Sequence, residues 1–138
     1  MDITEALTYA RQHHRGVLAA LKADGRPQLS NINYAAGDDG VIRISITDGR
    51  AKTVNLRRDP RASLHVTAEN FWSYVVIESD AELSAVATEP EDAAVEELID
   101  LYRQVNGEHP DWDDYRQAMV ADHRLVLRLH PSNAYGMA

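Results

Sequence analysis

Short segments of alternating apolar and polar residues, separated by turn residues, run through the first two thirds of the chain. The clearest is Val41 to Thr47, in which Ile42, Ile44 and Ile46 are separated by single polar residues. A period of two places one face of a strand in a core and the other toward solvent. Turn signals separate the segments at hairpin spacing, and Asp24-Gly25 is the strongest of them. The chain is therefore constrained to an antiparallel sheet.

Six or seven strands are expected in all. Besides Val41 to Thr47, the segments that read as strands are Gly16 to Ala23, Gln28 to Ala35, Arg61 to Ala68, Phe71 to Ser79, Ala81 to Val86, and Arg124 to His130, the last ending at Pro131. Apart from a short helix before Asp59-Pro60, three helices are predicted, namely Asp2 to about His14, a helix opening at Thr88-Glu89-Pro90-Glu91 and stopping at Gly107, and Trp112 to about Ala121. At 138 residues the chain predicts one domain, an antiparallel barrel with peripheral helices.

A basic turn interrupts this acidic chain between Ser45 and Arg61. The stretch passes from a strand through a glycine turn into a short helix, which Asp59-Pro60 ends. It holds five of the 14 Lys and Arg residues, although the net charge is -8; they are Arg50, Lys52, Arg57, Arg58 and Arg61. Free N–H groups, the helix dipole and cationic side chains converge at such a turn on an anion. We predict a phosphate site at Arg50, Lys52 and Thr53.

The other three arginines of this stretch leave two interpretations open. They could extend the anion site, they could face solvent, or they could pair with the acidic helices between Glu89 and Asp114.

Several classes of function are not expected. The net charge of -8 argues against general affinity for nucleic acid or an anionic membrane surface. Without cysteine there can be no disulfide, zinc thiolate site or cysteine nucleophile, and the six histidines show no paired metal-ligand spacing. Nucleophile-elbow and Walker-type motifs do not occur. The N-terminus lacks signal-peptide features and no apolar run approaches the roughly 20 residues of a membrane span, so we expect a cytoplasmic protein.

A second polar set lies in one predicted strand, at Gln28, Ser30, Asn31 and Asn33. Such groups either form hydrogen bonds with the backbone at the rim of a barrel, or form hydrogen bonds with the carbonyl and N–H edge of a planar heterocycle. Near the next turn, Phe71 is expected in the core, while Trp72 could cover a ring or a dimer seam.

Longer motifs resemble a known family. Gly25-Arg26-Pro27-Gln28-Leu29-Ser30-Asn31 and the Ser45 to Arg61 stretch are similar to the split β-barrel flavin and deazaflavin oxidoreductases of the pyridoxamine-phosphate-oxidase-like superfamily. Trp72-Ser73-Tyr74 and the segment from Gly107 to Val120 resemble its actinobacterial branch that binds coenzyme F420. The resemblance implies a split barrel of the FMN-binding type and a homodimer with two cofactor sites at the subunit interface.

The resemblance also assigns residues. Arg50, Ala51, Lys52 and Thr53 would hold the cofactor phosphate, with Asn55 supporting them. The residues expected beside the deazaflavin and its ribityl chain are Ser45, Ile46 and Thr47, and those expected at the polar edge of the ring are Gln28, Ser30 and Asn31. Trp72 and Ser73 would come from the partner subunit. No catalytic side chain and no metal are implied.

Three functions follow as alternatives. The first is a reductase that passes hydride from reduced F420 to a small conjugated organic acceptor. The second is an FMN enzyme of the pyridoxamine-phosphate-oxidase type, and the third is an F420 carrier without turnover. Surplus charge at the three downstream arginines favours F420, whose tail is acidic. Tyr34 is a candidate proton donor, although packing in the strand is the default interpretation of this residue.

Overall fold

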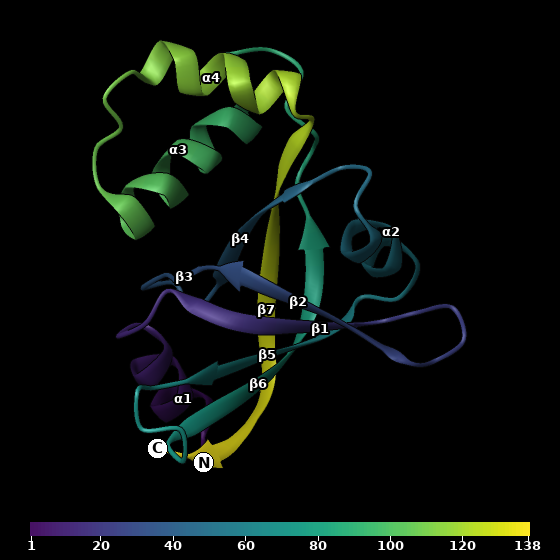
Figure 1. The fold of residues 1–138 in the computed structure, drawn as a ribbon, viewed down its shortest axis with the longest axis vertical. Coiled ribbons are helices and arrows are strands. Elements are labelled where there is room, and N and C mark those ends of the chain that lie inside the picture. Colours follow the sequence, from purple (N-terminus) through teal and green to yellow (C-terminus); the bar gives the residue numbers. More distant parts are fainter.

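The computed structural model describes all residues from 1 to 138. Four helices accompany seven strands (Figure 1). The helices are α1 (Ile3–Ala10), α2 (Ala51–Arg58), α3 (Ala93–Asn106) and α4 (Trp112–Ala121). The strands are β1 (Arg15–Leu21), β2 (Pro27–Asn33), β3 (Ala35–Ala36), β4 (Ile42–Thr47), β5 (Arg61–Thr67), β6 (Tyr74–Leu83) and β7 (Arg124–Met137).

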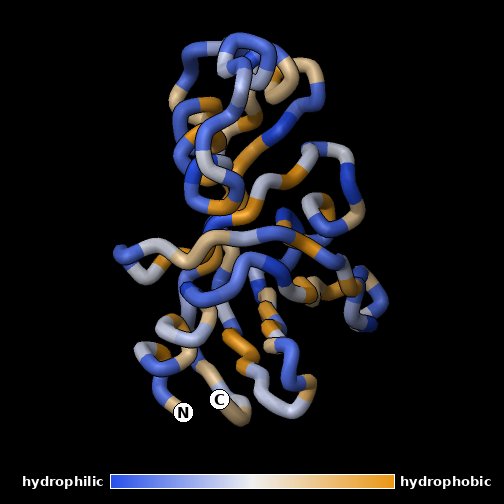
Figure 2. Tube along the Cα trace, turned by 60° about the vertical axis from the view of Figure 1, so that its left-hand side comes forward, coloured by the Kyte–Doolittle hydropathy of each residue, from blue (hydrophilic) through white to orange (hydrophobic).

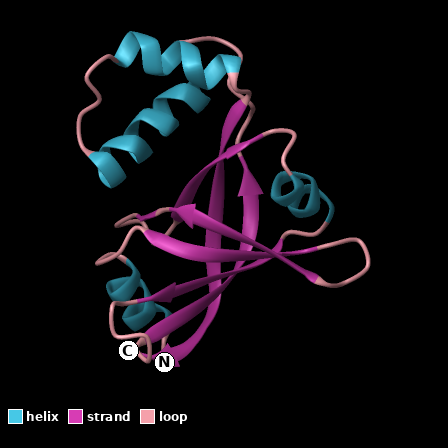
Figure 3. Ribbon diagram, in the orientation of Figure 1, coloured by secondary structure: helices cyan, strands magenta, loops and turns pink.

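All strands belong to one sheet in the order β2-β1-β5-β6-β7-β4-β3, and every neighbouring pair is antiparallel. The sheet curls strongly, so that strands from its two ends cross in front of one another (Figure 3). α1 lies at the end of the barrel that also holds both termini, while α3 and α4 lie together at the opposite end. The predicted antiparallel barrel with peripheral helices is confirmed.

The inner face of the curled sheet forms the main core. Ile42, Ile44 and Ile46 point into it, and the intervening side chains of β4 are only partly buried, as the alternation predicted. Tyr34 is fully buried beside them, and its hydroxyl donates to the Ala10 carbonyl of α1 at 2.8 Å. Burial raises the pKa of Tyr34 far above its usual value. Tyr34 is therefore a packing residue of the core, and the structure does not support a role for it as proton donor.

A second, smaller core holds the α3–α4 hairpin against the outer face of β7. Val126 of β7 packs there with Leu98, Ile99 and Tyr115 of the two helices. In Figure 2 apolar and hydrophilic residues alternate along the two helices of this hairpin, as expected of helices with one apolar face. The hairpin is therefore a separate layer that covers only one end of the barrel.

Two predicted strand limits are wrong, and both lie beside one bulge. Ala81 to Val86 is not a separate strand, because β6 runs without a break to Leu83. β7 does not end at Pro131 but continues to Met137 beside β6. The register shifts at Glu78/Ser79, where Ser79 faces Pro131 and Glu78 faces Asn133. A bulge tolerates proline because it needs no ladder N–H there.

Two predicted helix limits also differ. α1 ends at Ala10 rather than near His14, although its predicted cap at Asp2 is present. α3 begins four residues later than the Thr88 motif suggests, because the Asp92 carboxylate accepts from the N–H groups of Thr88, Glu89 and Val95. No helix is long and apolar enough to cross a membrane.

Candidate functional site

The basic turn is built by bonds that converge on one carbonyl. β4 ends at Thr47, whose carbonyl accepts from the Thr53 hydroxyl at 2.7 Å and from the Arg50 N–H at 3.2 Å. Arg50 is the N-cap of α2, and no side chain caps this helix. The N–H groups of Ala51, Lys52 and Thr53 have no acceptor within the chain. The first turn of α2 thus offers free donors and a positive dipole end.

The start of β7 lies directly against this turn. The Asp48 N–H donates to the His123 carbonyl at 3.0 Å, and Thr47 is paired with Arg124 across β4 and β7. His123 has a φ of 53°, a left-handed conformation in which the chain turns from α4 into β7. Because directly paired residues share a face of a sheet, Arg124 lies on the same side as Thr47.

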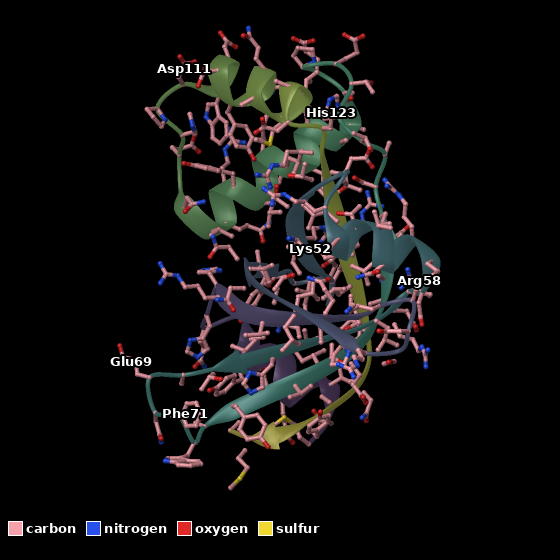
Figure 4. All side chains as sticks on the ribbon, turned by 45° about the vertical axis from the view of Figure 1, so that its right-hand side comes forward. Lys52, Arg58, Glu69, Phe71, Asp111 and His123 are labelled. Atoms are coloured by element: carbon pink, nitrogen blue, oxygen red, sulfur yellow. The ribbon has the colours of Figure 1, made fainter.

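These elements surround a cavity of about 470 Å3. β2 and β4 form one side, the first turn of α2 and the start of β7 another, and the α3–α4 hairpin the third. In Figure 4 Lys52 lies between the barrel and this hairpin, below His123. The lining residues are Asn31, Ile32, Asn33, Ser45, Ile46, Thr47, Arg50, Lys52, Leu101, Tyr102, Val105, Asn106, Tyr115, Met119 and Arg124.

The cavity is strongly positive. Arg50, Lys52 and Arg124 line it, none of them forms an ion pair, and no Asp or Glu is among the lining residues. Burial, followed by the charges of Arg50 and Arg124, lowers the pKa of Lys52. Uncompensated cations at close range repel one another, so an anion bound among them would relieve that repulsion.

The downstream arginines do not line this cavity. Arg57 pairs with Asp48 at 2.6 Å and Arg61 with Asp59 at 2.8 Å. Arg58 donates to the Asn55 side chain at 3.1 Å and to a backbone carbonyl. Their partners come from the same strand–turn–helix segment and from β1, so pairing with the acidic helices does not occur.

The structure brings six predicted site residues to the cavity, namely Asn31, Ser45, Ile46, Thr47, Arg50 and Lys52. Thr53 and Asn55 lie behind them and are buried, so their side chains brace α2 instead of lining the cavity. Gln28 and Ser30 bond to each other at 2.8 Å on the less exposed face of β2.

Trp72 and Ser73 lie far from the cavity of their own chain. They belong to the turn between β5 and β6, which Figure 4 shows at the opposite end of the barrel, at Phe71. Ser73 accepts the Tyr9 hydroxyl, whereas Phe71 and Trp72 are 70% and 77% exposed. Phe71 is therefore not a core residue as predicted, and Trp72 does not cover this chain's own cavity.

Sequence reasoning missed the far wall of the cavity. Tyr102, Val105 and Asn106 come from α3, Tyr115 and Met119 from α4, and Arg124 from β7. In sequence these residues belong to an acidic helical region and to an ordinary strand. No local pattern marks them, because only the pairing of β4 with β7 brings them to the basic turn.

Comparison with known proteins agrees with the fold. The family model described as Pyridoxamine 5'-phosphate oxidase matches residues 3–138. A conserved hypothetical protein from Mycobacterium tuberculosis is 25% identical, with a TM-score of 0.74, over 97% of this chain and 82% of that one. A structure named F420 Reductase is 22% identical, with a TM-score of 0.69, over 88% and 89%. The heme storage protein HutZ from Vibrio cholerae is 16% identical, with a TM-score of 0.68, over 99% and 95%. Neighbours with different ligands show that the fold alone does not identify the cofactor.

Proposed function

The chain belongs to the pyridoxamine 5'-phosphate oxidase family, and within it we propose an F420-dependent reductase. In this proposal the protein binds reduced coenzyme F420 and passes hydride to a small conjugated organic acceptor. The supporting observation is the cavity in which Arg50 and Lys52, both without an ion-pair partner, meet the free N–H groups of α2. The choice of cofactor comes from the motifs that resemble the F420-binding branch, Trp72-Ser73-Tyr74 and the segment from Gly107 to Val120, and the fold shared with the F420 Reductase is compatible with it.

The residues present fit a phosphorylated deazaflavin. Arg50 can donate two parallel bonds to phosphate oxygens, and Lys52 adds a point charge beside the helix N-terminus. Ser45 and Thr47, on the same side of β4, would receive the ribityl hydroxyls, and Asn31 at the edge of β2 would meet the polar edge of the ring. Bound F420 supplies the hydride, and the protein supplies orientation and a positive environment.

The residues bracing α2 act indirectly in this proposal. The Thr53 hydroxyl fixes the end of β4 relative to the first turn of α2, and Asn55 holds Arg58. Gln28 and Ser30 support the strand that carries Asn31. Their effect on binding would come through the position of the residues that line the cavity.

We further propose a homodimer in which Trp72 and Ser73 approach the partner's cofactor. Large apolar side chains are exposed in this turn, at Phe71 and Trp72, and at the end of β7, at Tyr135 and Met137. The rings of Phe71 and Trp72 pack edge to face with their centroids 5.2 Å apart, and both side chains are largely exposed. Exposed apolar patches of this kind mark association surfaces. Sedimentation of the wild type and of Trp72→Ser tests this; a monomeric wild type would contradict it.

FMN binding is the main alternative, because one argument that favoured F420 over FMN does not hold in the structure. The charge of Arg57, Arg58 and Arg61 was expected to serve the acidic F420 tail, but each is bonded to a neighbour in its own segment or in β1. That charge therefore no longer separates F420 from FMN. A carrier without turnover is the remaining alternative.

Titration with both cofactors tests the proposal. We expect the wild type to bind F420 more tightly than FMN, and Arg50→Ala with Lys52→Ala to weaken F420 binding at least about tenfold, since each charge-assisted bond is worth roughly 1.5–3 kcal/mol. Arg26→Ala, an exposed hairpin arginine, is the matched control. Tight FMN binding without F420 binding would overturn the choice of cofactor. Single-turnover oxidation of bound reduced F420 by a panel of acceptors separates a reductase from a carrier.

A further inference from the structure

Arg124 lines the cavity at the start of β7, in a position that the fold determines closely. It is paired with Thr47 across β4 and β7, so both side chains lie on the cavity side of the sheet. Its carbonyl accepts from the Ala87 N–H at 2.8 Å, and the preceding carbonyl, that of His123, accepts from Asp48. These bonds fix the backbone of Arg124 relative to the turn that leads to Arg50 and Lys52.

The side chain of Arg124 has no hydrogen-bond acceptor within the chain, unlike those of Arg116 and Arg128. Its Nε is buried without a hydrogen-bond acceptor, and no carboxylate forms an ion pair with it. Arg124 does not form a cation–π contact with the neighbouring aromatic rings either. The cation–π contact of the hairpin joins Arg103 to Trp112. A buried donor on a charged group is costly when left unpaired.

A bound anion would remove that cost. Arg124 is close enough to Lys52 for its charge to lower the pKa of the lysine, and Arg50 acts on the same lysine. The three cations therefore share one volume, and no acidic residue lines it. Two of them come from the basic turn and one from β7, so an anion between them would contact two elements that are distant in sequence.

We propose that Arg124 is a third anion-binding residue of this cavity, which completes a three-cation site for a phosphate group. The inference rests on the proposed function for its natural ligand, a phosphorylated flavin or deazaflavin, but the site itself concerns phosphate. Arg124 approaches from the start of β7, which lies directly against the turn that leads into α2.

The experiment pairs a variant with a ligand series. Arg124→Gln removes the charge and keeps a similar size, Arg124→Lys restores a charge, and Arg26→Gln removes an exposed charge elsewhere. Each protein is titrated with F420, with FMN, and with riboflavin and the phosphate-free deazaflavin riboside. A second arm measures the rise in Tm caused by inorganic phosphate, which depends on affinity for the folded state.

We expect Arg124→Gln to weaken the phosphorylated ligand that the wild type binds by about tenfold or more, while the phosphate-free ligands bind as they do to the wild type. Arg124→Lys should recover part of the loss, and Arg26→Gln should show none. Equal losses for phosphorylated and phosphate-free ligands would assign Arg124 to packing and overturn the inference, as would no loss at all.

The phosphate arm separates this inference from the proposed function. If the wild type binds neither cofactor, the proposed function fails, but a phosphate-induced rise in Tm that Arg124→Gln abolishes would still support the three-cation site. If phosphate raises the Tm of Arg124→Gln as much as that of the wild type, the inference is wrong whichever cofactor binds.

Discussion

Glu97 of α3 joins the helical hairpin to the barrel through a single carboxylate. Arg128 of β7 donates to both of its oxygens, with Nε at 2.8 Å, and Arg43 of β4 donates from Nε at 3.0 Å. The Glu97 side chain is only 20% exposed. Since α3 supplies one wall of the cavity, this contact should set both the stability of the hairpin and the shape of the site.

We expect Glu97→Gln to lower the free energy of unfolding by about 2–3 kcal/mol. Three charge-assisted bonds at roughly 1.5–3 kcal/mol each give an upper limit, which the remaining amide oxygen and partial solvent access reduce. The matched control is Glu96→Gln on the same helix. Glu96 is 55% exposed and pairs with Arg116 at 2.6 Å, so its loss should cost less than about 1 kcal/mol.

The difference in stability between the wild type and Glu97→Gln should also depend on pH. The hydrogen bonds from Arg128, followed by those from Arg43, lower the pKa of Glu97 despite its burial. A carboxyl whose pKa is lower in the folded state stabilises the protein above its unfolded pKa and loses that contribution as the pH falls through the folded value. The gap between wild type and Glu97→Gln should therefore be full at neutral pH and close in acid.

Urea denaturation at fixed protein concentration measures the effect. With an m-value of roughly 1–3 kcal/mol/M, Glu97→Gln should shift the midpoint by about 1 M or more with little change in slope. F420 affinity should fall together with stability, because Leu101 and Tyr102 of the same helix line the cavity. If Glu97→Gln and Glu96→Gln destabilise equally, the bridging role assigned to Glu97 is wrong.

Three further changes test other parts of the structure. Thr53→Val should cost about 1 kcal/mol of stability through the lost bond to Thr47, and should change F420 affinity less than about threefold; a tenfold loss of affinity at unchanged stability would instead mean direct phosphate contact. Affinity for F420 should decline as the pH rises through the lowered pKa of Lys52, because only the charged lysine binds the anion. Lys52→Arg should abolish that decline, and titrations across the alkaline range would show it. Gly136→Ala should destabilise the end of β7 measurably in thermal unfolding, since φ is 148° and a Cβ would lie 2.3 Å from the Tyr74 carbonyl; an unchanged Tm would refute that clash.

Local chemistry explains why much of the fold could be predicted. The alternation of Ile42, Ile44 and Ile46 appears as an inward-facing strand, and the predicted helix behind Asp111 has the limits Trp112–Ala121. Each feature depends on residues within a few positions of one another, so the sequence contains the whole interaction. The basic turn is of the same kind, because Arg50, Lys52 and the free N–H groups of α2 are adjacent along the chain.

The amino-acid sequence by itself determined the strands, most of the helix limits and the basic turn. Only the tertiary structure decided what faces that turn: the pairing of Thr47 with Arg124, the wall formed by α3 and α4, and the bonds that occupy Arg57, Arg58 and Arg61. The bulge that carries β7 past Pro131 likewise depends on its partner strand β6. The physical reason is that strand pairing joins residues far apart in sequence, and no local propensity specifies which distant charge will be left without a partner.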